Sequence, residues 1–155
     1  MRFVGVDFGR KRIGLATSDA TAMLAKAWRM VPGGATPAAS ADVVAPLVHA
    51  LIADDDGVEA VVIGLPKRLD GSESDQTPAV REFAAALARL VDRPIAFQDE
   101  RLTSVEAESR LAEREPDWRK RKLMIDAEAA AIILQDFLDA RARHDHPEPW
   151  QAGKK

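Results

Sequence analysis

The chain has 155 residues, of which 46% are hydrophobic and 30% charged, and this balance is typical of one soluble globular domain. It has no cysteine, which excludes disulfide bonds, thiolate zinc sites and a cysteine nucleophile. No apolar run approaches the ~20 residues that cross a bilayer, and the N-terminus lacks the layout of a signal peptide, so we expect a cytoplasmic protein.

The N-terminal part of the sequence predicts three short strands that follow one another as a meander. Residues 3–8 are apolar and rich in Val and Phe, and residues 12–17 follow after a short turn, so the two segments are expected to pair as a hairpin. A third strand is expected near 27–31, before Pro32 and two glycines interrupt the chain.

Helices and strands alternate in the rest of the chain. The expected elements are a helix over 37–53, a two-sided buried strand over 60–64, a helix capped by Ser74 or Asp75 and ending near 91, and a strand over 94–98. They predict one mixed α/β sheet with helices packed against it.

Two more helices are expected near the C-terminus. Thr103 and Glu106 form a capping box, so one helix should begin there and end before Pro116. The other should run from near Asp126 to about Arg143. We therefore expect a single domain over 1–143 and a flexible polar tail over 144–155.

Asp7 is a carboxylate inside a strand that otherwise consists of Phe, Val and Gly. A buried carboxylate costs several kcal/mol unless it is paired or bound to a metal, so Asp7 is a candidate functional residue. The alternative is that Asp7 lies just past the buried zone and accepts hydrogen bonds from the turn at Gly9.

Two further carboxylates join Asp7 as candidates. Glu100 follows a strand at its C-terminal end, where catalytic groups of open α/β sheets collect; Asp99 points to the opposite face, so only one of the two can join Asp7. Asp126 shares the sheet-facing side of its helix with Ala130. The alternatives are a surface pair of Glu100 with Arg101 and an N-cap role for Asp126.

Three converging carboxylates repel one another unless a cation lies between them. Hard oxygen ligands favour Mg²⁺ or Mn²⁺, and two such ions about 4 Å apart would form a phosphoryl-transfer site. The sequence therefore predicts a metal-dependent nuclease.

Four motifs resemble those of the bacterial pre-16S rRNA nuclease family, which is also described as Holliday-junction-resolvase-like and belongs to the RNase H-like superfamily. They are residues 4–9 (VGVDFG) with 11–16 (KRIGLA) and 18–19 (SD), residues 64–66 (GLP) with 70–72 (DGS), residues 99–104 (DERLTS), and residues 125–126 (ID) with 129–130 (AA) and 132–135 (IILQ). Their order and separations make the likeness specific over residues 3–138.

The resemblance implies a five-stranded mixed sheet whose first three strands are antiparallel, flanked by helices. It implies a catalytic and metal-binding triad of Asp7, Glu100 and Asp126, which selects Glu100 over Asp99. It also implies a hydrolase that processes the 5′ end of precursor 16S rRNA in ribosome biogenesis, or alternatively resolves branched DNA.

Basic residues surround this predicted site although the formal net charge is −3. Local clusters can bind phosphates on an acidic protein, and the alternative for each is solvated surface charge. The candidates for substrate binding are Arg10, Lys11, Lys67, Arg68 and Arg101, with a possible extension over 119–122 (RKRK). The His144-x-His146 pair in the tail is interpreted as incidental, because no fixed ligands accompany it.

Two other classes of function remain open. Asp7-x-Gly9 also resembles the first phosphate motif of actin-like ATPases and sugar kinases, but those proteins need two such lobes and this chain supplies one. A non-catalytic RNA- or protein-binding factor in transcription or ribosome assembly is the other. The sequence leaves open the choice of RNA or branched DNA and of monomer or homodimer, although a resolvase that cuts two strands would call for a dimer.

Overall fold

The computed structural model describes residues 1–100 and 117–143, and its description of side chains covers 1–100, 117 and 127–143. The helix expected over 103–115 and the tail over 144–155 lie outside these residues. Within the described residues, no helix is long and apolar enough to cross a membrane.

The three N-terminal strands form the predicted antiparallel meander. They are β1 (Arg2–Phe8), β2 (Arg12–Ser18) and β3 (Ala25–Pro32). In the first hairpin Phe8 pairs with Ile13 and Asp7 with Gly14. The hairpin prediction is confirmed, and β3 begins two residues earlier than predicted.

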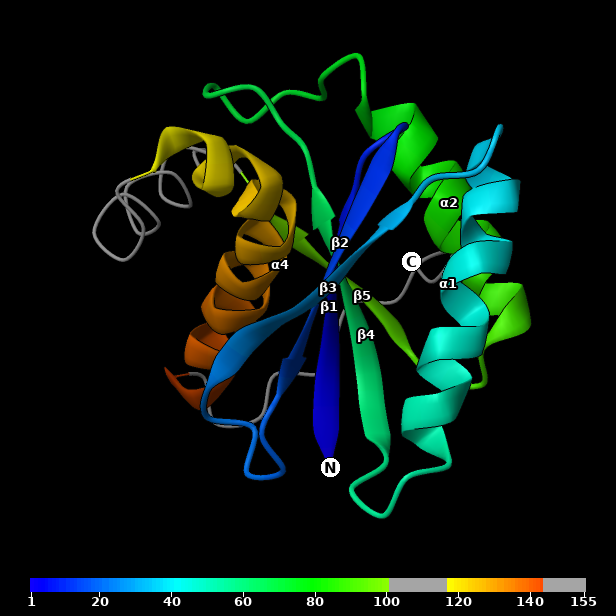
Figure 1. Cartoon of the computed structure of the whole chain (residues 1–155), viewed down its shortest axis with the longest axis vertical. Coiled ribbons are helices and arrows are strands. Elements are labelled where there is room, and N and C mark those ends of the chain that lie inside the picture. Colours follow the sequence, from blue (N-terminus) through cyan, green and yellow to red (C-terminus); the bar gives the residue numbers. More distant parts are fainter. Residues whose placement is uncertain (101–116, 144–155) are drawn as a thin grey trace.

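Two parallel strands complete the sheet. They are β4 (Val58–Leu65), which pairs with β1, and β5 (Ile95–Asp99), which pairs with β4. The crossovers contain α1 (Pro37–Ile52) and α2 (Thr77–Leu90). The strand order is β3-β2-β1-β4-β5, which confirms the predicted five-stranded mixed sheet (Figure 1).

Helices cover both faces of this sheet and enclose two apolar cores. Figure 1 shows α1 and α2 on one side and α4 (Trp118–Arg143) on the other. Val6, Ile63 and Phe83 belong to the core on the α1/α2 side, and Phe3, Val62 and Ile133 belong to the core under α4. Because strand residues alternate between the faces, β1 and β4 read as continuous apolar runs.

The first helix starts where the sequence predicts. Thr36 is the N-cap of α1, and its side-chain oxygen accepts a hydrogen bond from the Ala39 N–H over 3.1 Å. Pro37 occupies the first turn, where a missing N–H costs nothing.

The predicted cap of the second helix is wrong. α2 begins at Thr77 with Gln76 as N-cap, and no side chain caps it. The Ser74 N–H donates to Thr77 Oγ1 over 2.9 Å, and Thr77 Oγ1 donates to the Pro66 carbonyl over 2.7 Å. Ser74 therefore closes the preceding loop instead of capping the helix.

The last helix is longer than predicted. α4 begins at Trp118, so Asp126 lies inside the helix and the alternative of an N-cap role is wrong. Residues 118–125 contain neither Pro nor Gly, so nothing in the sequence stops the helix before Asp126. The helix thus begins eight residues before the predicted start near Asp126.

Glycine lets α4 lie very close to β1. A Cβ on Gly5 would come within 2.8 Å of Leu134 Cβ and 2.9 Å of the Ala130 carbonyl oxygen. Towards the other end of β1, the ring of Phe3 lies 5.5 Å from that of Phe137. β1 and α4 therefore run in opposite directions. The C-terminal end of β1, which carries Asp7, lies nearest the start of α4 (Figure 1).

The turn between β2 and β3 is organised by one carboxylate. Asp19 Oδ1 accepts hydrogen bonds from the Met23 and Leu24 N–H groups, both over 2.9 Å, and Asp19 Oδ2 accepts one from Thr21. These bonds lower the pKa of Asp19 to about 2, because each favours the charged form. Asp19, part of the first sequence motif, therefore has a structural role in this turn.

Candidate active site

Two carboxylates meet at one end of the sheet, beside the C-terminal ends of β1, β4 and β5. Asp7 shares a face with Gly5, and Gly5 faces α4. Glu100 directly follows β5, and its N–H donates to the Leu65 carbonyl at the end of β4 over 3.2 Å. The parallel register of β4 and β5 thus brings Glu100 to the level of Asp7.

The side chains of Asp7 and Glu100 share a hydrogen bond. Two carboxyl groups can do so only while one of them holds a proton. The pKa of Glu100 is raised to about 9, mainly by burial and then by the nearby charge of Asp7, the hydrogen bond to Asp7 and the charge of Asp99. The raised pKa of Glu100 means that, without a cation, the pair favours holding one proton between its two carboxyl groups.

A glycine makes room for the Glu100 carboxyl group. A Cβ on Gly64 would lie 2.6 Å from Glu100 Oε2 and 2.5 Å from Ile133 Cδ1. Gly64 faces α4 like Val62, so Glu100 occupies a narrow space between β4 and α4. The lack of a side chain at this strand position is thus part of the site.

The choice between Asp99 and Glu100, which spacing leaves open, has a geometric answer. Asp99 continues the alternation of Ile95, on the α1/α2 side, and Glu100 continues that of Ala96, on the α4 side. Asp7 also lies on the α4 side, and it is Glu100 whose side chain bonds to it.

Asp126, the third candidate, belongs to the part of α4 whose side chains lie outside the described residues. The same applies to residues 119–122, and Arg101 lies outside the described residues altogether. Among the described side chains, no group of three or more Asp, Glu, His or Cys is assembled. The described part of the site is therefore a pair of carboxylates.

The donor chemistry of this pair fits a hard divalent cation. Two carboxyl groups that share a proton in a half-buried space are oxygen ligands of the kind that Mg²⁺ or Mn²⁺ prefers. Asp7 and Glu100 would hold such an ion by replacing the shared proton.

Arg10 and Lys11 lie in the exposed turn that follows β1, three and four residues beyond Asp7. Arg10 lines two adjoining cavities of about 310 and 230 Å³, the first between the starts of α1 and α2, and Lys11 lines the second. These cavities lie on the α1/α2 side of the sheet. Arg10 and Lys11 thus lie at the same end of the sheet as Asp7 and Glu100. The two cavities beside them, however, lie on the face of the sheet opposite to Glu100.

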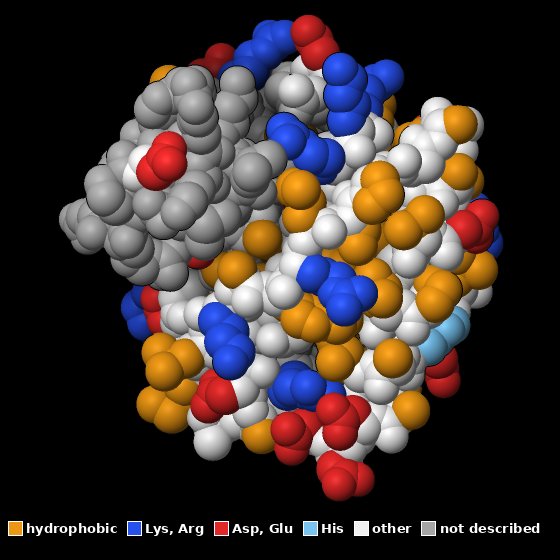
Figure 2. Space-filling model, viewed as in Figure 1, with side chains coloured by type: hydrophobic (Ala, Val, Ile, Leu, Met, Phe, Trp, Pro, Cys, Tyr) orange, Lys and Arg blue, Asp and Glu red, His pale blue; other side chains and the backbone are white. Residues whose placement is uncertain are grey.

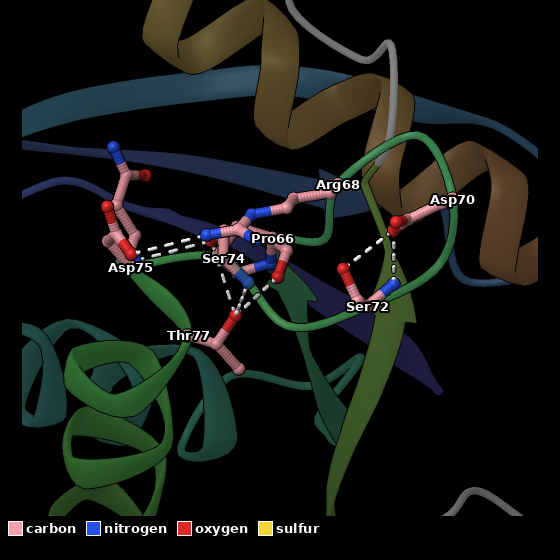
Figure 3. A network of polar contacts seen from close by, with 8 residues as sticks. Pro66, Arg68, Asp70, Ser72, Ser74, Asp75 and Thr77 are labelled. Atoms are coloured by element: carbon pink, nitrogen blue, oxygen red, sulfur yellow. Dashed lines mark hydrogen bonds and ion pairs between the residues drawn. The ribbon is translucent and has the colours of Figure 1, made fainter.

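Lys67 and Arg68 lie in the loop that joins β4 to α2, at the same end of the sheet. Figure 3 shows Arg68 in this loop. The backbones of Lys67 and Glu73 form an isolated antiparallel β-bridge, and the Arg68 N–H donates to the Ser72 carbonyl over 2.9 Å. The Arg68 side chain pairs with Asp75 over 3.5 Å, and both are exposed. An exposed pair of this length is weak, so Arg68 can exchange Asp75 for another anion.

A family model described as RuvX, Holliday junction resolvase, matches residues 1–140. The chain belongs to the RuvX family. A relative from Anaeromyxobacter sp. (strain Fw109-5) is 41% identical over 141 residues, which are 91% of this chain and 98% of the relative. A relative from Pelotomaculum thermopropionicum is 36% identical over 143 residues, 92% of this chain and 90% of the relative. Both are named "putative pre-16S rRNA nuclease".

Two solved structures share the fold of this RuvX chain. RuvC of Thermus thermophilus superposes with a TM-score of 0.54 at 16% identity, covering 97% of this chain and 100% of RuvC. The Holliday junction resolvase of fowlpox virus gives 0.50 at 12% identity, covering 90% and 99%. These likenesses confirm the predicted RNase H-like fold.

Two residues of the RuvX site have roles that the sequence analysis did not assign. Gly64 leaves space for Glu100, and the fully buried Thr77 ties the start of α2 to the Pro66 carbonyl. The only sequence signal for Gly64 is a glycine within an apolar strand, which often marks a close approach. Thr77 gives no such signal, because hydroxyl residues at helix starts are common.

Proposed function

We propose that this RuvX protein is a metal-dependent endonuclease that hydrolyses phosphodiester bonds, with Asp7, Glu100 and Asp126 as catalytic and metal-binding residues. The observation that carries the proposal is the half-buried Asp7–Glu100 pair, which shares a proton at the C-terminal edge of β1, β4 and β5. Burying two acids together is costly unless a cation or a proton lies between them, so a cation is the expected occupant.

Asp126 belongs to this proposal through the direction of α4. Phe137 lies at Phe3 and Ala130 at Gly5, so the next turn of the helix towards its start approaches the level of Asp7. Asp126 is one turn before Ala130. A third carboxylate there would complete a site for two Mg²⁺ or Mn²⁺ ions.

The chain's own groups would bind the ions and place the scissile phosphate. A bound divalent cation would supply positive charge for the attacking and leaving oxygens of an in-line displacement. The backbone of Glu100 would keep a fixed position, because its N–H donates to the Leu65 carbonyl, and its carboxyl group fits in the space that Gly64 leaves. Arg10, Lys11, Lys67, Arg68 and Arg101 would hold the nucleic-acid backbone on either side.

The proposed substrate is precursor 16S rRNA, cleaved near its 5′ end during ribosome biogenesis. The names of the relatives support this choice, and it would place the protein in the cytoplasm. The second candidate is a four-way DNA junction, which the description of the family and the fold shared with RuvC support. A resolvase would act as a homodimer, whereas an rRNA nuclease can act as a monomer.

The decisive experiment measures cleavage of both substrates by the same preparation. Wild type, Asp7→Asn, Glu100→Gln and Asp126→Asn are incubated with precursor 16S rRNA and with junction DNA, each with Mg²⁺ or with excess EDTA. Each variant should lose cleavage by orders of magnitude and remain folded, because each loses an oxygen ligand and not a packing group. The faster substrate identifies the biological one.

Asp99→Asn is the matched control, because Asp99 is adjacent in sequence and lies on the other face. Near wild-type cleavage by one of the three variants would remove that residue from the site. Full cleavage in excess EDTA would exclude metal dependence. Nucleic-acid binding without any cleavage by wild type would instead identify a non-catalytic assembly or transcription factor.

A further inference from the structure

The edge of the sheet formed by β3 carries basic side chains that the proposed active site does not use. Among the strands of the described residues, β3 pairs only with β2, so no described strand lies along the other side of its eight residues. Lys26, Arg29 and Pro32 on this strand are all exposed. An open edge of this length needs either a cover or a device that keeps other strands away.

β3 has several such devices. Leu15 pairs with Arg29 and Ala16 with Ala27, so Trp28 is the extra residue of a bulge. A bulge, two cations and a proline all oppose the addition of another strand. A second copy of this chain, added antiparallel, would place like charges against one another. The edge is therefore unsuited to protein strands and has the charge to attract a polyanion.

Arg29 is held ready to bind an anion. Its guanidinium carbon lies 5.0 Å from the centre of the Trp28 ring, so the aromatic face restricts the side chain and leaves its N–H groups exposed. Among the described side chains (1–100, 117 and 127–143), neither Lys26 nor Arg29 forms an ion pair with a carboxylate, whereas Arg2, Arg68, Arg81 and Arg141 do. A phosphate would not have to displace an acidic partner there.

These cations lead towards the active-site end of the molecule. Arg12 pairs with Pro32, and the Gly33 N–H donates to the Lys11 carbonyl over 2.9 Å, so the end of β3 adjoins the turn that holds Arg10 and Lys11. Figure 2 shows separate Lys and Arg side chains from the top to the bottom of this face. Lys26 and Pro32 are six residues apart, or about 20 Å along a strand.

We propose that the β3 edge binds the phosphodiester backbone of the substrate beyond the cleavage site, through Lys26 and Arg29. The proposal rests on the proposed function, since it extends the path of the same nucleic acid. One strand carries a charge about every 3.4 Å of helix axis, so 20 Å faces about six phosphates. The contacts would be non-specific for base sequence, because only backbone charges meet β3.

The test compares Lys26→Ala/Arg29→Ala with wild type in binding titrations over a salt series, with Ca²⁺ replacing Mg²⁺ to suppress turnover. The probes are RNA stem-loops with a short or a long stem and DNA junctions with short or long arms. Each lost phosphate contact lowers the slope of log affinity against log salt by about 0.7 to 0.9, so the double variant should lose about 1.4 to 1.8 with the long probes. With the short probes it should match wild type. The probe class whose slope changes identifies the nucleic acid.

Arg89→Ala/Arg143→Ala is the matched control, because it removes the same charge from exposed residues at the far ends of α2 and α4. Lys26→Arg/Arg29→Lys keeps both charges and should keep the wild-type slope. An unchanged slope in Lys26→Ala/Arg29→Ala would overturn the proposal, and so would equal losses in both alanine pairs. Light scattering measures the oligomeric state of both proteins. If wild type is a dimer and Lys26→Ala/Arg29→Ala is a monomer, the proposal is also overturned, because β3 then contacts a second copy of the chain. Failure of wild type to bind any probe would count against the proposed function itself.

Discussion

At the scale of single residues, the site is defined by a carboxyl group in an unfavourable place. Glu100 is mostly buried, its pKa is raised by that burial and by Asp7, and its carboxyl group occupies the space that the missing side chain of Gly64 leaves. A residue kept in such a place costs stability in the absence of a cation.

The stability of the metal-free protein should therefore depend on pH through Glu100. Its pKa is about 9 in the folded chain and near 4.5 in the unfolded chain, so between these values folding retains a proton that unfolding releases. The stability that Glu100 contributes is fully present below about pH 4.5 and is lost progressively towards pH 9, by at most about 1.4 kcal/mol per pH unit. Denaturant titrations in EDTA at several pH values measure this slope.

Glu100→Gln should remove that slope and raise the free energy of unfolding at pH 7 by roughly 1–3 kcal/mol, because an amide carries no charge to bury. Asp92→Asn, at an exposed position between α2 and β5, is the control and should behave as wild type. A Glu100→Gln protein with the same pH slope as wild type would show that the Asp7–Glu100 pair does not share a buried proton.

At the scale of secondary-structure elements, the packing of α4 on β1 and β4 determines the geometry of the site. Gly5 and Gly64 both allow α4 to approach the sheet. Of the two, only Gly64 is a position where an added Cβ would also meet Glu100. A methyl group at these positions is therefore expected to have different consequences. At Gly5 it would meet α4, and at Gly64 it would meet α4 and the carboxyl group.

Gly64→Ala should lower cleavage by about 100-fold, because displacing a catalytic group by about 1 Å has effects of this size. Its free energy of unfolding should fall by about 1–3 kcal/mol, as is usual when a methyl group is forced into a packed core. Gly5→Ala should lose similar stability with a smaller loss of cleavage. Thermal unfolding and cleavage rates of both variants, measured together, test this. Equal losses of cleavage at equal stability would mean that Gly64 has no special relation to Glu100.

The Asp19 turn offers a separate test at the level of the β2–β3 hairpin. Asp19 contributes stability as the carboxylate, so this contribution is present above about pH 4 and is lost as the pH falls towards 2. Asp19→Ala should lower the Tm at pH 7, and the difference from wild type should shrink towards pH 2. A difference that does not change with pH would show that the charge of Asp19 is unimportant for the turn.

At the scale of the whole molecule, a negatively charged protein must bind a polyanion next to an acidic site. The net charge is −3, and Asp7 and Glu100 add local repulsion when both are ionised. Cations at the turn after β1, in the loop after β4 and on β3 offset this only locally. Binding of nucleic acid should therefore depend strongly on a divalent ion at the carboxylates.

Mg²⁺ and Mn²⁺ should stabilise the folded protein as well as activate it. A ligand at 100 times its Kd adds about 2.7 kcal/mol, and each kcal/mol raises the Tm of a domain of this size by about 2–4 °C. Wild type should show this rise, and Asp7→Asn should not. Ca²⁺ should raise the Tm too but support cleavage poorly, because its shell is larger and less strictly ordered. A wild-type Tm that is unaffected by all three ions would contradict a metal site.

The sequence by itself determined the order of elements, the antiparallel meander and the position of Asp7. Apolar alternation and turn residues act over a few neighbours, so they are legible along the chain. Spacing alone left Asp99 and Glu100 open, and the family resemblance selected Glu100. The tertiary structure decided how Glu100 meets Asp7, because this depends on the register of β5 against β4. It also decided that Gly64 frames the carboxyl group and that Trp28 bulges beneath Arg29. Those contacts join residues far apart in the chain, and no local pattern encodes them.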